Sequence, residues 1–80
     1  MKVPRNVSAD ELIKLLERHG YTAVRQTGSH IRLSKKFDDW EHSITVPNHK
    51  PVKIGTLHSI AKDICATNGL SISEFYNQLQ

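Results

Sequence analysis

Residues 30–34 alternate between polar and apolar side chains. Ile31 and Leu33 fall on one side of an extended chain, and the other side carries His30, Arg32 and Ser34. Because successive side chains of a strand point to opposite faces of a sheet, this pattern predicts a strand with one buried and one exposed face. The chain must therefore supply elements that cover the Ile31 side, while the side of His30 faces solvent.

Segments before and after this strand also have strand character. Tyr21–Gln26 contains tyrosine, threonine and valine, and His42–Pro47 alternates until Pro47, which cannot donate to a ladder. The connections are short, namely a turn at residues 27–29 and a polar loop expected at Lys35–Glu41. Short connections of this kind predict an antiparallel meander of three strands.

A helix is predicted before the strands, over Ala9–His19. Ser8 and Glu11 have the spacing of a capping box, and Gly20 follows as a stop signal. The apolar positions share one helical face: Leu12, Leu15, Leu16 and His19.

Two further helices are predicted after the strands. The first has apolar residues at helical spacing, with Gly55 or Thr56 expected to cap its start and Asn68-Gly69 to end it. Its apolar face consists of Leu57, Ile60, Ala61, Ile64 and Cys65. The second is short, at about Ser71–Leu79, and begins with another Ser-x-x-Glu pattern.

The order of these elements predicts an α+β fold. Helix, three strands, helix and short helix correspond to the double-stranded-RNA-binding-like topology, α-β-β-β-α, with a three-stranded antiparallel sheet covered on one face by helices. Residues 1–80 fit a single domain, and we expect residues 1–7 to be flexible. No signal-peptide core or membrane-spanning run is present, so we expect a cytoplasmic location and no membrane partner.

Charge is distributed unevenly along the chain. The net charge is +3, and Tyr21–Lys36 holds four basic residues and no acidic one. Three acidic residues then surround Trp40: Asp38, Asp39 and Glu41. A basic chain permits binding to a polyanion, although a solvated charged surface has the same composition.

His30 is the most informative candidate for chemistry. Gly28 permits a tight turn before it, and Ser29 supplies a hydroxyl or backbone N–H nearby. An imidazole moves protons near neutral pH, and the basic neighbours suit a phosphate substrate. This combination indicates handling, and cleavage, of nucleic acid; a plain exposed histidine is the alternative.

The other histidines have simpler interpretations. His19 is expected at the edge of the core, His42 at the start of a strand, and His58 on the surface within reach of a substrate. His49 lies in a loop with Lys50 and Lys53, where it either holds phosphate or is merely exposed. No zinc-type ligand spacing is present, so no metal site is predicted, and Cys65 is expected to be a buried apolar residue.

Taken in order, several segments resemble the HicA family of bacterial toxins, also called YcfA-like mRNA interferases. The resemblance covers about residues 8–79 and rests on these segments: Glu11–Leu16, Gly20-Tyr21, Arg25–His30, Thr45–His49, Gly55–Leu57 before Ile60, Gly69-Leu70 and Phe75. The chain departs from the family pattern at His58 and in its acidic 38–41 segment.

The resemblance implies a specific activity. Such proteins are toxins of type II toxin–antitoxin systems that cleave mRNA without a metal or other cofactor, and a HicB-type antitoxin neutralises them by covering the site. The histidine of the Gly-Ser-His motif, here His30, is implied as the catalytic residue. RNA-binding residues are then expected to be Arg25, Ser29, Arg32, His49, Lys50 and Lys53.

Two other functions remain open at this point. An RNA-binding domain without catalysis would need only the exposed sheet face and basic loops. A protein-interaction domain would use exposed aromatic residues as anchors, with Tyr21, Phe37 and Trp40 as candidates, although core packing is the simpler role for each. The sequence does not identify the second catalytic group or the RNA sequence preference. It also does not fix the oligomeric state, for which a monomer is one option.

Overall fold

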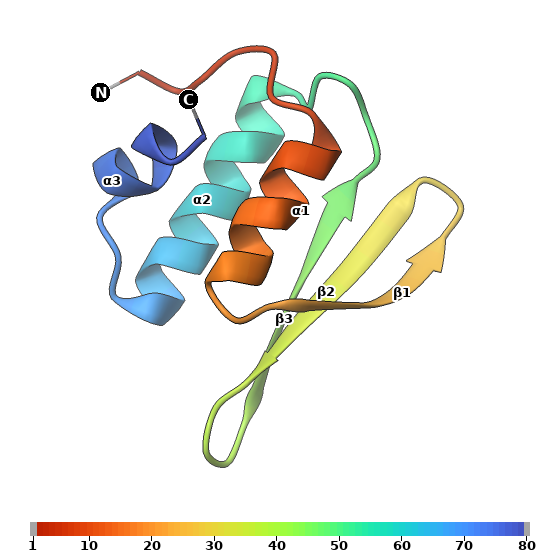
Figure 1. The fold of residues 1–80 in the computed structure, drawn as a ribbon, viewed down its shortest axis with the longest axis vertical. Coiled ribbons are helices and arrows are strands. Elements are labelled where there is room, and N and C mark those ends of the chain that lie inside the picture. The colour runs from red at the N-terminus through yellow and green to blue at the C-terminus, as the bar shows by residue number, and fades with distance from the viewer. Residues whose placement is uncertain (1, 80) are drawn as a thin grey trace.

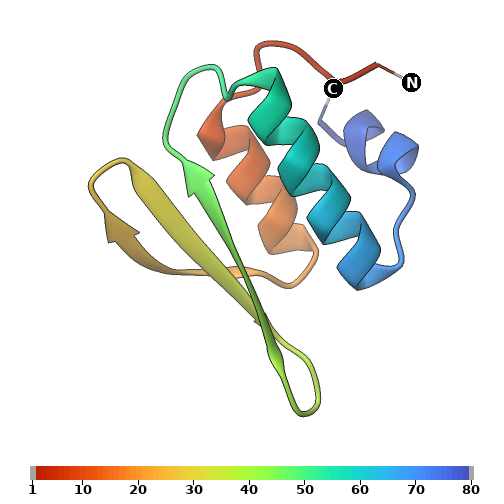
Figure 2. The ribbon, with the colours of Figure 1, turned by 180° about the vertical axis from the view of Figure 1, so that it is seen from behind.

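The chain forms a three-stranded sheet with helices on one side. The computed structural model describes residues 2–79, and its elements are α1 (Ala9–Arg18), β1 (Thr22–Thr27), β2 (His30–Lys36), β3 (Glu41–Pro47), α2 (Ile54–Asn68) and α3 (Ile72–Asn77). Figures 1 and 2 show the three helices gathered on one side of the strands, with the β2–β3 hairpin extending past them. The predicted α+β fold with a double-stranded-RNA-binding-like topology is confirmed.

The sheet is an antiparallel meander with β2 in the centre and β1 and β3 at its edges. Leu33 of β2 is opposite Ala23 on one side and Ile44 on the other. The β1–β2 register shifts between Ala23 and Arg25, which leaves Val24 as the extra residue of a bulge. Both edge strands therefore have one row of backbone groups that β2 does not use.

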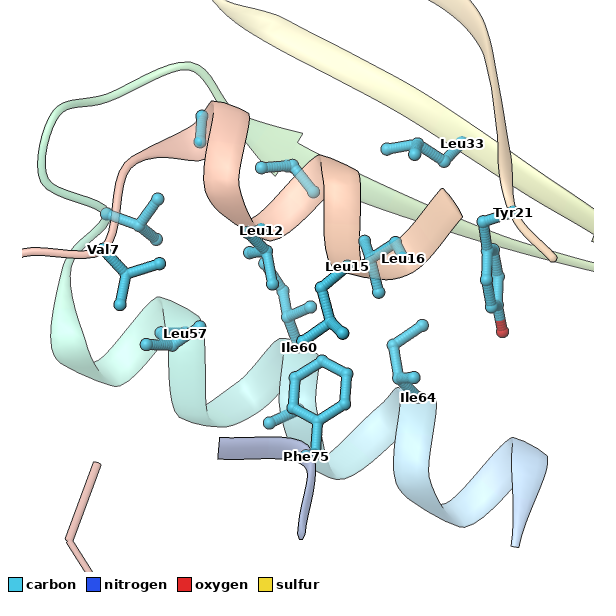
Figure 3. Close-up of a cluster of buried hydrophobic side chains, with 14 of the residues drawn as sticks. Val7, Leu12, Leu15, Leu16, Tyr21, Leu33, Leu57, Ile60, Ile64 and Phe75 are labelled. Carbon is cyan, nitrogen blue, oxygen red and sulfur yellow. The ribbon is translucent and has the colours of Figure 1, made fainter. Parts of the chain in front are cut away.

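The core lies among the three helices and between them and the sheet (Figure 3). Leu33 and Val46 of the sheet are fully buried, as are Leu12 and Leu16 of α1 and Leu57 of α2. These are the apolar positions that the strand and helix periodicities predict, because each regular element turns one face inward. Cys65 is also buried, as expected.

The start of α2 differs from the prediction. Lys53 is the N-cap residue and makes no side-chain capping bond, so the expectation that Gly55 or Thr56 caps the helix is wrong. The helix begins earlier because Val52 is anchored in the core directly before it, at 3% exposure. Its end is as predicted, since Gly69 adopts the left-handed conformation with φ of 66°.

The connection predicted as a polar loop at Lys35–Glu41 is shorter than predicted and covers residues 37–40. β2 continues to Lys36 and β3 begins at Glu41, so only a tight turn separates them. The Phe37 N–H donates to the Trp40 carbonyl at 2.8 Å, and the two rings stack with centroids 4.6 Å apart. This aromatic pair extends the hairpin where charge composition alone suggested a loop.

The segment before α1 is partly anchored. Val7 is 2% exposed, and its carbonyl accepts a hydrogen bond from the Val52 N–H at 2.7 Å. The flexibility expected for residues 1–7 stays a prediction, and Met1 lies outside the described residues. Within residues 2–79, no helix has the length and apolar character needed to cross a membrane.

Candidate functional site

His30 opens β2 immediately after a two-residue turn. Gly28 has φ of 58°, a conformation that L side chains rarely adopt, so glycine suits the turn. The Asn48 N–H donates to the Ser29 carbonyl at 2.6 Å, which ties the turn to the residue after β3. His30 is exposed and is paired with Thr27 and Pro47 on the neighbouring strands. The ring therefore stands on the sheet face away from the helices.

Two arginines lie beside His30 on this face. Arg32 follows it by two residues on β2 and is opposite Arg25 of β1 and Thr45 of β3. Together with Thr27 these residues line a shallow hollow of about 210 Å³ that includes His30. We call this hollow the His30 pocket. It combines a titratable imidazole, which can transfer protons, with two permanent positive charges, which can bind phosphate.

Thr27 and Thr45 were not predicted as site residues. Thr45 lies on the polar side of a predicted strand, so its exposure was indicated by the alternation there. Thr27 was assigned to the turn at residues 27–29, whereas in the structure it is the exposed last residue of β1. Their proximity to His30 follows only from the pairing of three strands, which places Thr27 across from His30 and Thr45 across from Arg32. Their hydroxyl groups add hydrogen-bonding capacity to the wall of the pocket.

The remaining predicted RNA-binding residues lie outside the His30 pocket. Ser29 is exposed in the turn beside it. His49, Lys50 and Lys53 lie in the exposed loop between β3 and α2, where the His49 carbonyl accepts from the Ala9 N–H at 3.2 Å. Lys53 instead lines a separate hollow at the start of α2. A role of these residues in RNA binding stays a prediction.

Two other histidines are held by side-chain hydrogen bonds within the fold. Nε2 of His19 lies 3.0 Å from the Gln78 Oε1 atom, and its ring lies beside Phe75, which matches the core-edge prediction. Nδ1 of His58 lies 2.9 Å from the Tyr76 hydroxyl, so this side chain is directed at α3. Neither belongs to the His30 pocket.

His42 belongs to a polar network at the opposite end of β3. Its Nδ1 atom lies 2.6 Å from the Tyr21 hydroxyl, and its Nε2 atom lies 3.1 Å from the Asp63 carboxylate. Tyr21 is only 2% exposed, so it is not available as an exposed anchor for a partner. Burial raises the pKa of the Tyr21 hydroxyl. The hydrogen bond from Asn68 lowers this pKa by a smaller amount, and the negative charge of Asp63 raises it. The network thus connects the sheet to α2.

Residues 2–79 contain no group of three or more histidine, cysteine, aspartate or glutamate side chains placed to hold a metal ion. Burial raises the pKa of the Cys65 thiol. A raised pKa disfavours the thiolate, which is the form that binds metals and attacks substrates.

Comparison with known proteins gives one match. Residues 9–64 match the family model described as the HicA toxin of bacterial toxin–antitoxin systems. No curated protein and no solved structure matched this chain. The match covers well over half of the 80 residues and includes all three strands, α1 and the His30 pocket. The chain therefore belongs to the HicA toxin family.

Proposed function

We propose that this toxin is an endoribonuclease that cleaves mRNA, with His30 as its general acid or base. The observation that carries the proposal is the His30 pocket, in which His30 shares one exposed sheet face with Arg25 and Arg32. Family membership supports it, since it implies a toxin with a cognate antitoxin. The combination of an imidazole with fixed cations suits proton transfer at a phosphodiester.

The proposed reaction is an internal transesterification of the RNA. The 2′-hydroxyl of the RNA attacks its adjacent phosphorus, forming the O2′–P bond and breaking the P–O5′ bond. The products are a 2′,3′-cyclic phosphate and a free 5′-hydroxyl. His30 either accepts the proton of the 2′-hydroxyl or donates a proton to the leaving 5′-oxygen, and water or another group performs the other transfer. Arg25 and Arg32 stabilise the negative charge that grows on the phosphate oxygens.

The proposal includes a protein partner and a cellular consequence. Cleavage of mRNA stops translation and growth until a HicB-type antitoxin binds the toxin, and an mRNA substrate places the protein in the cytoplasm. Lys50 and Lys53 are proposed to bind RNA phosphates beyond the His30 pocket, together with Ser29 and His49. Their exposure leaves them accessible to a chain that extends past the sheet.

The test compares the wild-type protein with His30→Ala on single-stranded RNA in the presence of EDTA. We expect the wild type to leave cyclic-phosphate ends and the variant to be inactive but folded, as judged by circular dichroism. Expression of the wild type should arrest growth, and the variant should not. Undiminished cleavage by folded His30→Ala would exclude the catalytic role. Tight RNA binding without cleavage by the wild type would instead favour a non-catalytic RNA-binding domain.

A further inference from the structure

One row of backbone N–H and C=O groups on β3 points away from β2 and forms a free edge. The register of the β2–β3 ladder determines which residues contribute to it. In antiparallel pairing, residues alternate between those that bond to the neighbouring strand and those that point away from it. The Ser29–Asn48 and Phe37–Trp40 backbone bonds mark the bonded positions at the two ends of the β2–β3 ladder. In the register of the ladder, both bonds require that the backbone N–H and C=O groups of the even-numbered residues of β3 point toward β2. The N–H and C=O groups of Ser43 and Thr45 therefore point away from the sheet.

A groove lies alongside this edge. It has a volume of about 640 Å³ and is lined by residues of both β3 and α2. In the view of Figure 2, these two elements lie on either side of α1. β3 contributes Ile44 and Thr45, and the helix contributes residues that include Gly55, Ser59 and Asp63. An added Cβ at Gly55 would meet nothing within 4 Å, so the helix side of the groove has room for side chains of an occupant.

We propose that an extended segment of the antitoxin binds in this groove as a fourth strand, paired with β3. Strand addition uses the free backbone groups of the edge for affinity, and alternate side chains of the added strand enter the groove for specificity. This inference rests on the proposed function for its partner and adds where, and by which geometry, the partner binds.

The charge of the groove selects among the possible occupants. Asp63 is the charged residue among the described residues that line the groove. Its side chain is 48% exposed and lies beside His42. A carboxylate repels the phosphates of RNA and attracts a lysine or arginine of a protein strand. A second copy pairing through its own β3 fits less well, because that strand reads Glu-His-Ser-Ile-Thr-Val-Pro and has neither lysine nor arginine. The other free edge, β1, carries Arg25, but this side chain already lines the His30 pocket. The occupant is therefore an extended protein segment with a cationic side chain near Asp63.

Thr45 connects this groove to the His30 pocket. Its backbone lies on the free edge of β3, and the residue lines both hollows. A fourth strand beside Thr45 would extend the sheet face that carries Arg32 and His30, at about 4.8 Å from β3. RNA approaching the His30 pocket from that side would meet the antitoxin, so docking at the edge also obstructs the site.

Amide hydrogen exchange tests the geometry directly. The 80-residue protein is compared by NMR with and without a purified HicB-type antitoxin. We expect the Ser43 and Thr45 amides to exchange at least about tenfold more slowly in the complex, because they gain hydrogen bonds. Gln26 on the free edge of β1 is the matched control and should be unchanged. Protection at Gln26 instead would overturn the inference, as would concentration-dependent protection of Ser43 and Thr45 without partner, or protection by RNA alone.

A pair of variants tests the groove without touching the His30 pocket. Ser59→Arg fills the groove from α2, whereas Ala66→Arg puts the same side chain on an exposed position of the same helix outside it. We expect Ser59→Arg to weaken antitoxin binding by at least about tenfold, by calorimetry, with RNA cleavage retained, and Ala66→Arg to match the wild type. Equal binding by both variants would overturn the inference. No binding by wild type would overturn the antitoxin assignment itself, whereas a bound complex with unprotected Ser43 and Thr45 overturns this inference alone.

Discussion

The hydroxyl oxygen of Tyr21 lies 2.6 Å from Nδ1 of His42, and this contact joins the start of β1 to the start of β3. Nε2 of His42 faces the Asp63 carboxylate and donates to it. In a ring protonated at Nε2 alone, Nδ1 accepts from the Tyr21 hydroxyl. The Tyr21 oxygen in turn accepts from Asn68 Nδ2 at 3.0 Å. Every polar atom of the contact is thereby paired, which makes the buried hydroxyl tolerable in the core.

Tyr21→Phe should destabilise the protein. It removes the hydroxyl and leaves both Nδ1 of His42 and the Asn68 amide without this partner, at a cost of about 1–3 kcal/mol in the free energy of unfolding. Urea unfolding at pH 7 measures the effect. Tyr76→Phe is the matched deletion and removes a single bond, to His58, so its loss should be smaller. A larger loss in Tyr76→Phe would contradict the importance of the network.

Stability should fall at alkaline pH. Burial raises the pKa of both Tyr21 and Tyr76 above the ordinary value of 10.0, since the protonated hydroxyl is favoured in the folded state. Their contribution is fully present below the unfolded pKa and is lost as pH rises through the folded pKa values. The free energy of unfolding should therefore decline above about pH 10, measured by urea unfolding at a series of pH values. Tyr21→Phe should decline less steeply than the wild type, and an equal slope would count against a raised Tyr21 pKa.

Two glycines should respond oppositely to alanine. Gly28→Ala places a side chain at φ of 58°, with a strain of about 1–2 kcal/mol, and disturbs the turn that aims His30, so stability and RNA cleavage should both fall. Gly55→Ala lies in the first turn of α2 with open space around it and should be neutral or stabilising by up to about 1 kcal/mol. Thermal unfolding and a cleavage assay distinguish the pair. Equal effects would argue against conformational strain at Gly28.

The two arginines of the His30 pocket should contribute to cleavage. Arg25→Ala or Arg32→Ala removes a charged hydrogen-bond donor, worth about 1.5–3 kcal/mol, so kcat/KM for RNA should fall by about tenfold or more. Arg18→Ala, an equivalent deletion at the end of α1, is the control and should have no such effect. The salt dependence of RNA binding should also become shallower in the pocket variants, because each releases fewer counterions. Unchanged kcat/KM in both variants would remove these side chains from the proposed mechanism.

Much of the fold follows from local patterns. The apolar positions of α1 and α2 and the alternation at Ile31 and Leu33 predicted which faces are buried, and the structure confirms them. The side chain at the N-cap of α1, Ser8, also acts as predicted, since it accepts a hydrogen bond from the Glu11 N–H. Such features depend on residues that are close together in the sequence, so the local pattern of residues is enough to predict them.

Other features depend on contacts that no local pattern contains. The early start of α2 at Ile54 follows from the burial of Val52, and the long β2–β3 hairpin follows from the stacking of Phe37 on Trp40. For the segment that connects β2 and β3, charge composition favoured a loop, because Asp38, Asp39 and Glu41 are poor strand residues. In the structure these three side chains are exposed at the tip of the hairpin, where they remain in contact with water.

The exposure of His30 was thus determined by the sequence alone, through the phase of the residues that follow it. Which side chains surround it was decided by the tertiary structure. Strand register brings Arg25, Arg32 and Thr45 to the imidazole, and the packing of α2 beside β3 forms the groove next to them. Periodicity specifies which way a side chain points within its own element, whereas only the pairing of distant segments specifies its neighbours.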